Sequence, residues 1–495
     1  MDTRAVLAGV PVRTGIPVEV RDRAVTGLEY DSRKIRSGNL FFAFPGARDD
    51  GRRYARQAME SGAVAVVSEL PELEGEGIPW IQVEHGRRAL ALACRNFHGA
   101  PERDLRLTGV TGTNGKTTVT YLIDAVLRHA GKVTAVLGTI GNQVAGERLK
   151  AVNTTPESLD LYRLFDRLRA RGGTQVTMEV SSHGLALGRV YALQFHTVVF
   201  TNLSQDHLDF HASMEEYFEA KRTLFFANGA GAPEWAVINA DDEYGRRLAP
   251  GEETKTLTYG LGSGAAVRAE DVELGFDGLR FTLRYGGAAA GVRSRLVGEV
   301  NVYNILAACG VGISYGLELG MIAAGIAECE AVAGRFERVD EGQPFLFVVD
   351  YAHTPDALRN AIRVARSLKP KRVITVFGCG GDRDRTKRPL MGMAAGELSD
   401  FVVLTSDNPR SEDPLNIIND ALVGLRRYDT PHLVEADRAR AIRLAVEEAR
   451  PGDLILLAGK GHETYQVLRD QTILFDDGEK AREVLREFGY RRKQG

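Results

Sequence analysis

Several features that would assign this chain to a special class are scarce or missing. Its four cysteines form no C-x-x-C pair, so neither a zinc site nor a disulfide framework is indicated. No apolar run approaches the ~20 residues that cross a bilayer, and the N-terminus lacks a basic segment followed by a long apolar one. The net charge is -3 and no block of lysine and arginine stands out. We therefore expect a soluble cytoplasmic protein with no membrane span and no nucleic-acid partner.

The chain of 495 residues is too long for one hydrophobic core, and its 44% hydrophobic and 26% charged residues are ordinary for a globular protein. Alternating apolar strands and helix patterns predict three α/β domains, at residues 1–100, 101–332 and 333–495. The first of these has no catalytic signature of its own. Its Asp31-Ser32-Arg33 segment is most simply a polar turn.

A glycine-rich stretch, Leu105 to Leu122, reads L-R-L-T-G-V-T-G-T-N-G-K-T-T-V-T-Y-L. An apolar strand pattern enters a turn with three glycines, and a helix pattern opens at Lys116 and Thr117. Glycines let the backbone curl so that its N–H groups face phosphate oxygens, while the lysine reaches the β/γ-phosphates and the threonine suits Mg²⁺. The strict pattern G-x-x-x-x-G-K-[ST] fails, because its first position falls on Val110. The alternative is a turn without a ligand, but the sequence favours an ATP or GTP site.

Polar residues follow other predicted strands of residues 101–332. Glu179 closes the apolar run 176–180, and Asp206 and His207 follow the run 197–201. Carboxylates are hard ligands suited to Mg²⁺, although histidine is a less usual one. Taken singly, Glu179 could cap a turn and His207 could be an ordinary loop histidine; together with a phosphate loop they favour a metal site. Lys221, within a helix pattern, is by itself a solvated lysine.

Residues 333–495 contain four apolar strand patterns that each end in a polar, Gly/Pro-rich loop. The carboxyl ends of parallel strands share one edge of a sheet, so this edge should gather Arg383, Arg410, Lys460 and Glu463. Such an edge offers donors to carboxylates and an acceptor to an ammonium group. Considered alone, Arg410 would be a surface arginine paired with an acid such as Glu412.

The motifs that carry these residues occur together and in one order: T-G-T-N-G-K-T-T, N-T-T-P-E, E-V-S-S-H-G-L, D-H-L-D-F-H, Y-F-E-A-K, D-Y-A-H-T-P-D, G-C-G-G-D-R-D, D-N-P-R and G-K-G-H-E. In this the chain resembles the Mur ligase family of ATP-dependent amide-forming enzymes, and within it the MurE branch. The resemblance spans the whole chain. It implies a small N-terminal α/β UDP-binding domain, a central parallel-sheet domain like those of P-loop NTPases, and a C-terminal Rossmann-like α/β domain.

The resemblance also implies roles for individual residues. Catalytic roles fall to Lys116, Glu179, His207 and Lys221. Metal ligands would be Thr117, Glu179, His207 and Lys221, the last as a carbamate. ATP contacts would be Gly112, Thr113, Asn114, Gly115, Lys116, Thr117, Thr118, Asn304, Arg335, Asp350 and His353. Contacts to the UDP-linked muramyl dipeptide would be Ser32, Arg48, Asn153, Thr154, Thr155, Ser181 and Arg189. Contacts to the incoming amino acid would be Arg383, Asp407, Asn408, Pro409, Arg410, Gly459 and Glu463.

One position departs from the family pattern. Many members carry a glutamine two residues before the arginine that matches Arg189, whereas this chain has Leu187. One hydrogen bond to substrate is therefore in doubt, but the reaction is not.

The activity implied is addition of meso-diaminopimelate to the D-glutamyl side-chain carboxylate of UDP-N-acetylmuramoyl-L-alanyl-D-glutamate, through an acyl phosphate, with ATP and Mg²⁺. This is a step of cytoplasmic peptidoglycan precursor synthesis, and we expect a monomer. Alternatives are the same reaction with L-lysine, decided by the loop 407–410, and folylpolyglutamate synthetase, against which N-T-T-P-E and D-N-P-R argue. A phosphate-loop switch or transport ATPase would release phosphate without needing a sugar peptide and an amino acid. A binding module without catalysis would leave these groups idle.

Overall fold

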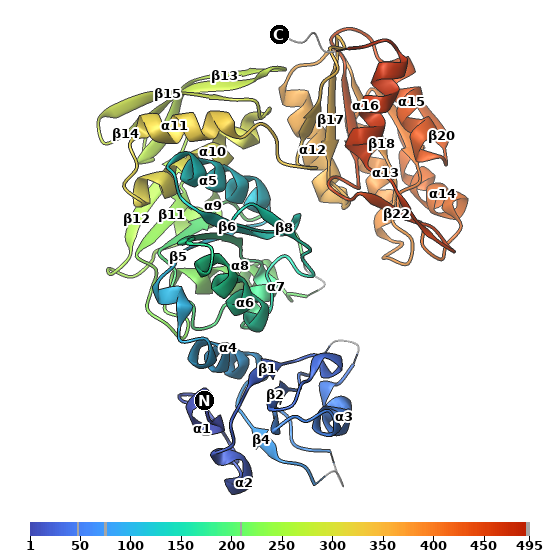
Figure 1. The fold of residues 1–495 in the computed structure, drawn as a ribbon. Coiled ribbons are helices and arrows are strands. Elements are labelled where there is room, and N and C mark those ends of the chain that lie inside the picture. Colours follow the sequence, from blue (N-terminus) through green and yellow to red (C-terminus); the bar gives the residue numbers. More distant parts are fainter. Residues whose placement is uncertain (47–48, 74–76, 208–209, 492–495) are drawn as a thin grey trace. The chain divides into compact units, whose positions relative to one another are not determined.

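The structure is a computed structural model that describes residues 1–46, 49–73, 77–207 and 210–491. The chain divides into two compact units: residues 1–266 with 307–318, and residues 267–306 with 319–495. The first unit contains two mainly parallel sheets, and the second contains an antiparallel meander and a mainly parallel sheet; their strands are labelled in Figure 1 where there is room. The expected α/β class is confirmed, whereas the domain boundaries near residues 100 and 332 stay predictions.

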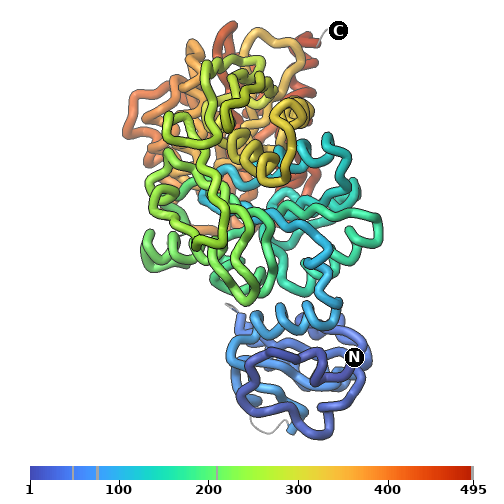
Figure 2. The backbone as a smooth tube through the Cα atoms, turned by 90° about the vertical axis from the view of Figure 1, so that its left-hand side faces the viewer, coloured from blue at the N-terminus to red at the C-terminus, as the bar shows by residue number. Residues whose placement is uncertain are grey.

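The N-terminal part of the first unit, blue in Figure 2, is a four-stranded parallel sheet with helices on both faces. Leu40 and Phe42 pack into the core on one face, and Phe41 and Ala43 pack with the helix 55–60 on the other. Burial on both faces explains the unbroken apolar run in this strand. The elements are α1 (Thr3–Val6), α2 (Val18–Arg21), β1 (Gly27–Glu29), η1 (Ser32–Lys34), β2 (Asn39–Phe42), η2 (Gly51–Tyr54), α3 (Ala55–Glu60), β3 (Ala65–Ser68), β4 (Trp80–Gln82), α4 (Gly86–Phe97) and η3 (Pro101–Arg103).

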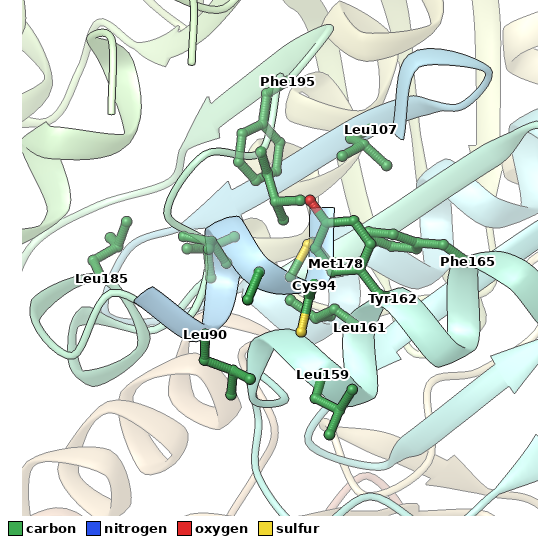
Figure 3. Close-up of a cluster of buried hydrophobic side chains, with 14 of the residues drawn as sticks. Leu90, Cys94, Leu107, Leu159, Leu161, Tyr162, Phe165, Met178, Leu185 and Phe195 are labelled. Carbon is green, nitrogen blue, oxygen red and sulfur yellow. The ribbon is translucent and has the colours of Figure 1, made fainter. Parts of the chain in front are cut away.

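The helix α4 joins this sheet to the rest of the unit through apolar packing. Leu90 and Cys94 of α4 lie in one cluster with Tyr162 and Phe165 of α6 (Ser158–Arg169), as Figure 3 shows. Both cysteine and tyrosine are buried there, and no disulfide is formed by any of the four cysteines. Apolar burial of this kind contributes roughly 25 cal/mol per Å².

The larger sheet of the first unit places β5 between β9 and β10, and both pairings are parallel. Helices follow the strands in the expected alternation: α5 (Lys116–His129), α6, α7 (Ser182–Ala186), α8 (Met214–Arg222), η4 (Thr223–Phe225) and α9 (Glu243–Arg247). In this unit the strands lie in the order β12 (Lys255–Gly260), β11 (Trp235–Asn239), β10 (Thr197–Phe200), β5 (Arg106–Thr111), β9 (Gln175–Glu179), β6 (Thr134–Gly138), β7 (Gly141–Val144), β8 (Glu147–Leu149).

The second unit begins with an antiparallel meander, β13 (Val267–Gly275), β14 (Gly278–Tyr285) and β15 (Ala288–Ser294), beside α11 (Leu319–Glu328). This meander was not expected from the sequence. The helix α10 (Glu299–Ser314) contributes residues to both units.

A six-stranded sheet forms the rest of the second unit. Helices α12 (Pro355–Ser367), α13 (Lys387–Leu398) and α14 (Pro414–Leu425) cover one face, while α15 (Arg438–Glu448) and α16 (Asp477–Glu487) cover the other. A hairpin of β22 (Tyr465–Val467) and β23 (Thr472–Leu474) follows β21. The sheet order is β16 (Glu337–Val339), β17 (Leu346–Asp350), β21 (Leu454–Ala458), β18 (Val373–Phe377), β19 (Phe401–Thr405), β20 (His432–Glu435).

The four strand patterns expected in this region are confirmed as β17, β18, β19 and β21, with ends shifted by at most a few residues. Among the described residues, no helix is both long and apolar enough to span a bilayer.

Gly392 of α13 and Gly424 of α14 let these two helices approach closely. A Cβ at Gly424 would lie 1.8 Å from the Pro389 carbonyl oxygen, whereas a Cβ at Gly320 in α11 would meet nothing within 4 Å. We expect Gly424→Ala to destabilise the protein by roughly 1–3 kcal/mol, because the helices must separate. Gly320→Ala should be neutral or slightly stabilising, since alanine favours helix. Urea unfolding followed by circular dichroism measures both, and equal midpoints would contradict the close contact.

Candidate active site

The glycine-rich loop after β5 has the geometry of an anion-binding turn. Gly112 adopts φ +145°, and a Cβ there would lie 1.9 Å from the Thr201 hydroxyl oxygen, so only glycine fits. The helix α5 begins at Lys116, and no side chain caps its N-terminus. The N–H groups and the dipole at a helix N-terminus favour a phosphate.

The side chain of Lys116 turns back over this loop. Its Nζ donates to the carbonyl oxygens of Gly112, at 3.0 Å, and Thr113, at 2.8 Å. The loop is also tied to the end of β10, because the amide of Asn114 donates to the Asn202 side chain at 3.0 Å. The predicted phosphate-binding residues Gly112 to Thr118 are therefore brought together as one turn.

Glu179 ends β9 beside the start of α5, and it is only 1% exposed. Its carboxylate accepts from the Thr117 hydroxyl at 3.0 Å and from the amide and hydroxyl of Thr139, at 2.8 and 3.1 Å. Two predicted metal ligands therefore touch directly. Thr139 was missed in the sequence, although its position after the strand β6 could have indicated it.

Lys221 is buried, with 1% of its surface exposed, so the view of it as a solvated lysine is wrong. Its Nζ donates to the Gly112 carbonyl oxygen at 2.8 Å and lies over the Tyr217 ring. Burial, helped by the charge of Lys116, lowers the pKa of Lys221 well below its usual value. The structure thus places a buried lysine amine against the phosphate loop.

His207 follows β10 with a left-handed backbone, φ +53°, and its ring lies 3.7 Å from the Asp206 carboxylate. Its side chain is 41% exposed, and its ring also contacts those of His183 and Tyr217. In the ranges that the structure describes, no three His, Cys, Asp or Glu side chains form a group that could hold a metal ion. Asp209 lies outside the described residues.

Most residues predicted to contact the muramyl dipeptide lie around the start of α7. The Ser181 hydroxyl caps this helix and lies 3.1 Å from the Thr155 hydroxyl. Arg189 donates to Glu157 at 2.9 Å and to the Thr155 carbonyl oxygen at 3.0 Å. Thr154 contacts Thr139 at 3.1 Å.

Two others of that set, Asn153 and Ser32, are not joined to this group by any hydrogen bond within the described part of the chain. Asn153 is half-buried in the preceding loop. Ser32 lies in η1, where its hydroxyl donates to Gln57 at 3.4 Å. Arg48 lies outside the described residues.

The remaining residues predicted for ATP, Asn304, Arg335, Asp350 and His353, belong to the second unit. The buried Asp350 carboxylate accepts from the amides of Phe336 and Ala352, and burial raises its pKa. The guanidinium of Arg335 lies over the Tyr351 ring at 5.1 Å. Asn304 is buried and donates to Asn301, while His353 is exposed.

The loops after β19 and β21 meet at Asn408. Its amide donates to the Glu463 carboxylate at 2.8 Å, and its oxygen accepts from Lys460 at 3.3 Å. Burial raises the pKa of the neighbouring Asp407. A Cβ at Gly459 would lie 2.5 Å from an Asp407 carboxylate oxygen, so glycine leaves room for that acid. Lys460 is fully buried and also pairs with Glu463. Its place at the end of a strand indicated that it lies at this edge of the sheet, but not that it holds Glu463.

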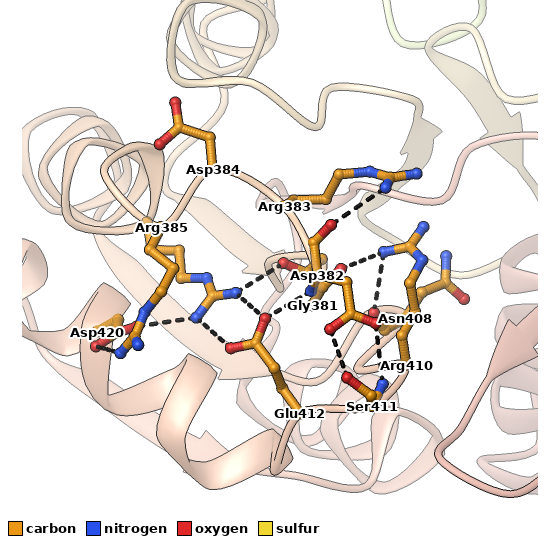
Figure 4. Close-up of polar contacts among 12 residues, drawn as sticks. Gly381, Asp382, Arg383, Asp384, Arg385, Asn408, Arg410, Ser411, Glu412 and Asp420 are labelled. Atoms are coloured by element: carbon orange, nitrogen blue, oxygen red, sulfur yellow. Dashed lines mark hydrogen bonds and ion pairs between the residues drawn. The ribbon is translucent and has the colours of Figure 1, made fainter. Parts of the chain in front are cut away.

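Arg383 and Arg410, both labelled in Figure 4, come from two different loops, and both side chains approach Gly380. A Cβ at Gly380 would lie 3.1 Å from the Nη1 of Arg410 and 3.6 Å from the Cγ of Arg383. Arg410 donates to the Gly381 carbonyl oxygen at 2.7 Å, and within the described ranges no carboxylate forms an ion pair with it. The alternative in which Glu412 holds Arg410 is wrong, because Glu412 pairs with Arg388.

Three segments match families of known domains: residues 24–98 the Mur ligase family, catalytic domain; residues 110–312 the Mur ligase middle domain; and residues 334–461 the Mur ligase, glutamate ligase domain. A UDP-N-acetylmuramoyl-L-alanyl-D-glutamate–2,6-diaminopimelate ligase of Solibacter usitatus is 60% identical over 494 residues, covering 100% of both chains. One of the same name from Geobacillus thermodenitrificans is 46% identical over 94% of this chain and 95% of that one.

Solved structures agree. A ligase of the same name has a TM-score of 0.72 at 33% identity and covers 99% of both chains. MurF ligase from Thermotoga maritima, solved with ADP, has a TM-score of 0.61 at 18% identity, over 94% of this chain and 97% of that one, and supports the fold alone. A phosphate loop on one parallel sheet and a polar edge on another define an ATP-dependent ligase of three α/β domains. The chain belongs to the Mur ligase family.

Lys116 tests the nucleotide site. We expect Lys116→Ala to lose ATP-dependent turnover by at least about a hundredfold while keeping its thermal midpoint, because the change removes a charge that faces phosphate at a loop. Lys132→Ala, an exposed lysine just after the same helix, is the matched control and should behave as the wild type. Near-normal turnover of Lys116→Ala would contradict the assignment.

Proposed function

We propose that this protein joins meso-diaminopimelate to the D-glutamyl side-chain carboxylate of UDP-N-acetylmuramoyl-L-alanyl-D-glutamate, with ATP as the energy source. The observation that carries the proposal is Arg410, a guanidinium beside Arg383 that is bonded to carbonyl oxygens and not to an acid. Such a group is suited to a substrate carboxylate. The full-length similarity to ligases named for this reaction supports the same substrates.

The chemistry has two steps. The γ-phosphoryl group of ATP passes to the D-glutamyl carboxylate, giving an acyl phosphate and ADP. The amine of diaminopimelate then attacks the acyl carbon, forming the amide while phosphate leaves and the amine loses a proton. Two anions meet in the first step, so Lys116 and the N-terminal end of α5 stabilise the charge that develops.

Magnesium ions fit the residues around Glu179. The Thr117 hydroxyl and the buried Glu179 carboxylate offer hard oxygen donors side by side. His207 is a less usual ligand, and Lys221 would add oxygens as a carbamate. When bound, magnesium neutralises phosphate charge. The lowered pKa of Lys221 favours the neutral form of the amine, which is the form that reacts with CO₂ to give a carbamate and one proton.

The amino-acid site is proposed at the edge formed after β18, β19 and β21. Arg410 would bind the far carboxylate of diaminopimelate, and Arg383 would bind a second carboxylate. Glu463, held by Asn408 and Lys460, would accept from an ammonium group. The further contacts proposed are Asp407, Asn408, Pro409 and Gly459.

The first ~100 residues are proposed to hold the UDP end of the substrate, with Ser32 and Arg48 near it, while Asn153, Thr154, Thr155, Ser181 and Arg189 contact the dipeptide. Since ATP and UDP-linked precursors are cytoplasmic metabolites, we propose that the enzyme works in the cytoplasm, in peptidoglycan synthesis, and as a monomer. The test is to supply ATP, the UDP-linked dipeptide and a panel of amino acids, then identify products by mass. A tripeptide with diaminopimelate is expected; product with L-lysine only, or phosphate release that needs no amino acid, would refute the proposal.

Arg410 is predicted to select diaminopimelate over L-lysine, because lysine lacks the far carboxylate. A charge-assisted contact contributes about 1.5–3 kcal/mol, so Arg410→Ala should reduce the kcat/KM ratio between the two amino acids by roughly ten- to a hundredfold. Arg363→Ala, an exposed arginine on α12, is the control and should leave the ratio unchanged. If Arg410→Ala keeps the full preference for diaminopimelate over L-lysine, another residue selects the amino acid.

Lys221 is predicted to be essential through its carbamate. Lys221→Ala should be nearly inactive and should recover part of its turnover when a short carboxylate such as formate or acetate is added, since the acid can occupy the vacated space. Lys116→Ala should not recover under the same conditions. Intact turnover of Lys221→Ala, or electron density for an unmodified Lys221 in an active crystal, would reject the role.

A further inference from the structure

The two loops that carry Arg383 and Arg410 are joined by one buried arginine. Arg388 lies in the first turn of α13, and its side chain is only 2% exposed. Its guanidinium donates twice to the Glu412 carboxylate, at 2.7 and 2.9 Å, and once to Asp420, at 2.9 Å. It also donates to the carbonyl oxygen of Gly380, at 3.2 Å. One side chain therefore bonds the loop after β18, the loop after β19 and the helix α14.

Glu412 completes the link from the other side. One of its carboxylate oxygens accepts from the backbone amide of Asp382 at 2.5 Å, directly before Arg383 in the chain. The bonds from Arg388 lower the pKa of Glu412 to about 2, so it is a carboxylate at neutral pH. Figure 4 shows Glu412 turned toward the Gly381–Asp382 backbone and away from the Arg410 guanidinium.

This arrangement determines which acid can reach Arg410. Glu412 is two residues away in the chain, and Asp382 is occupied by the hydroxyl of Ser411, at 2.6 Å, and by its amide. A carboxylate released from its partner gains most by pairing with the nearest unpaired guanidinium. If Glu412 were released, it would compete with substrate for Arg410.

We propose that Arg388 is a positioning residue for amino-acid selection: by holding Glu412, it fixes the two recognition loops to each other and keeps Arg410 available for the far carboxylate of the substrate. The inference rests on the proposed function, since it concerns how that site selects its amino acid. Arg388 itself is buried and does not touch the substrate in this role.

The test compares Arg388→Met with Arg388→Met/Glu412→Gln. Methionine keeps an unbranched buried chain but releases Glu412, so KM for diaminopimelate should rise and the preference over L-lysine should fall about tenfold, while KM for ATP stays within about twofold. In the double variant the amide of glutamine cannot form an ion pair with Arg410. The preference for diaminopimelate should therefore return to within about threefold of the wild type. If Arg388 only stabilised the fold, the second substitution would not restore the preference.

Arg372→Met is the matched control. Arg372 pairs with Asp453 and Glu448, at 2.7 Å each, just before β18 begins, which is the opposite end of the strand from the recognition loops. It should lower the thermal midpoint without changing the preference for diaminopimelate.

Each outcome decides the matter. An unchanged preference in Arg388→Met, or a double variant as unselective as the single one, overturns the inference. If Arg388→Met does not fold, Glu412→Gln alone decides: it should keep the preference while raising KM, and loss of the preference would overturn the inference. A wild-type enzyme that does not use diaminopimelate would instead refute the proposed function.

Discussion

The parallel pairing of β5 with β9 and β10 is the constraint from which the site in the first unit follows. Val110 lies opposite Glu179, and Thr111 lies opposite Phe200, so the three strands end at nearly the same level. The phosphate loop leaves from the middle strand, the Glu179 carboxylate ends one neighbour, and the loop to Asp206 and His207 leaves from the other. A slip of one residue would turn Glu179 to the opposite face of the sheet.

Buried charge recurs where loops must be held at the edge of a sheet. Arg438 and Asp477 in the second unit are completely buried, with nitrogen and oxygen 2.6 Å apart. Arg438 also donates to the carbonyl oxygen of Ser406, just after β19, and to that of Ala458, the last residue of β21. Burying such a pair costs desolvation, and removing one partner typically costs about 3–5 kcal/mol. Like Arg388, the buried Arg438 thus holds the loops that follow two strands in a fixed direction.

Much of this could be predicted from the sequence because strand ends and phosphate loops are local patterns. The strands 346–350, 373–377, 401–405 and 454–458 are apolar runs closed by turn residues, and Lys116 and Thr117 stand directly after glycines. The burial of Lys221 could not be predicted, because it depends on where the helix α8 packs. The pairing of Arg388 with Glu412 joins residues 24 positions apart, and neither belongs to a motif. The meander 267–294 was missed because its strands alternate buried and exposed residues and have no long apolar run.

Four residues with left-handed backbone have φ between 48° and 54°: Asp382 and Arg410 in the recognition loops, His207 in the loop after β10, and Phe336 just before β16. This conformation costs a residue other than glycine roughly 1–2 kcal/mol. An engineer who screened variants for heat resistance alone would find glycine or asparagine attractive at these four places. The variants selected by such a screen would then lack the guanidinium of Arg410 and the imidazole of His207. At these positions, substitutions that raise thermostability would therefore weaken substrate selection, so a screen of this enzyme has to measure both properties.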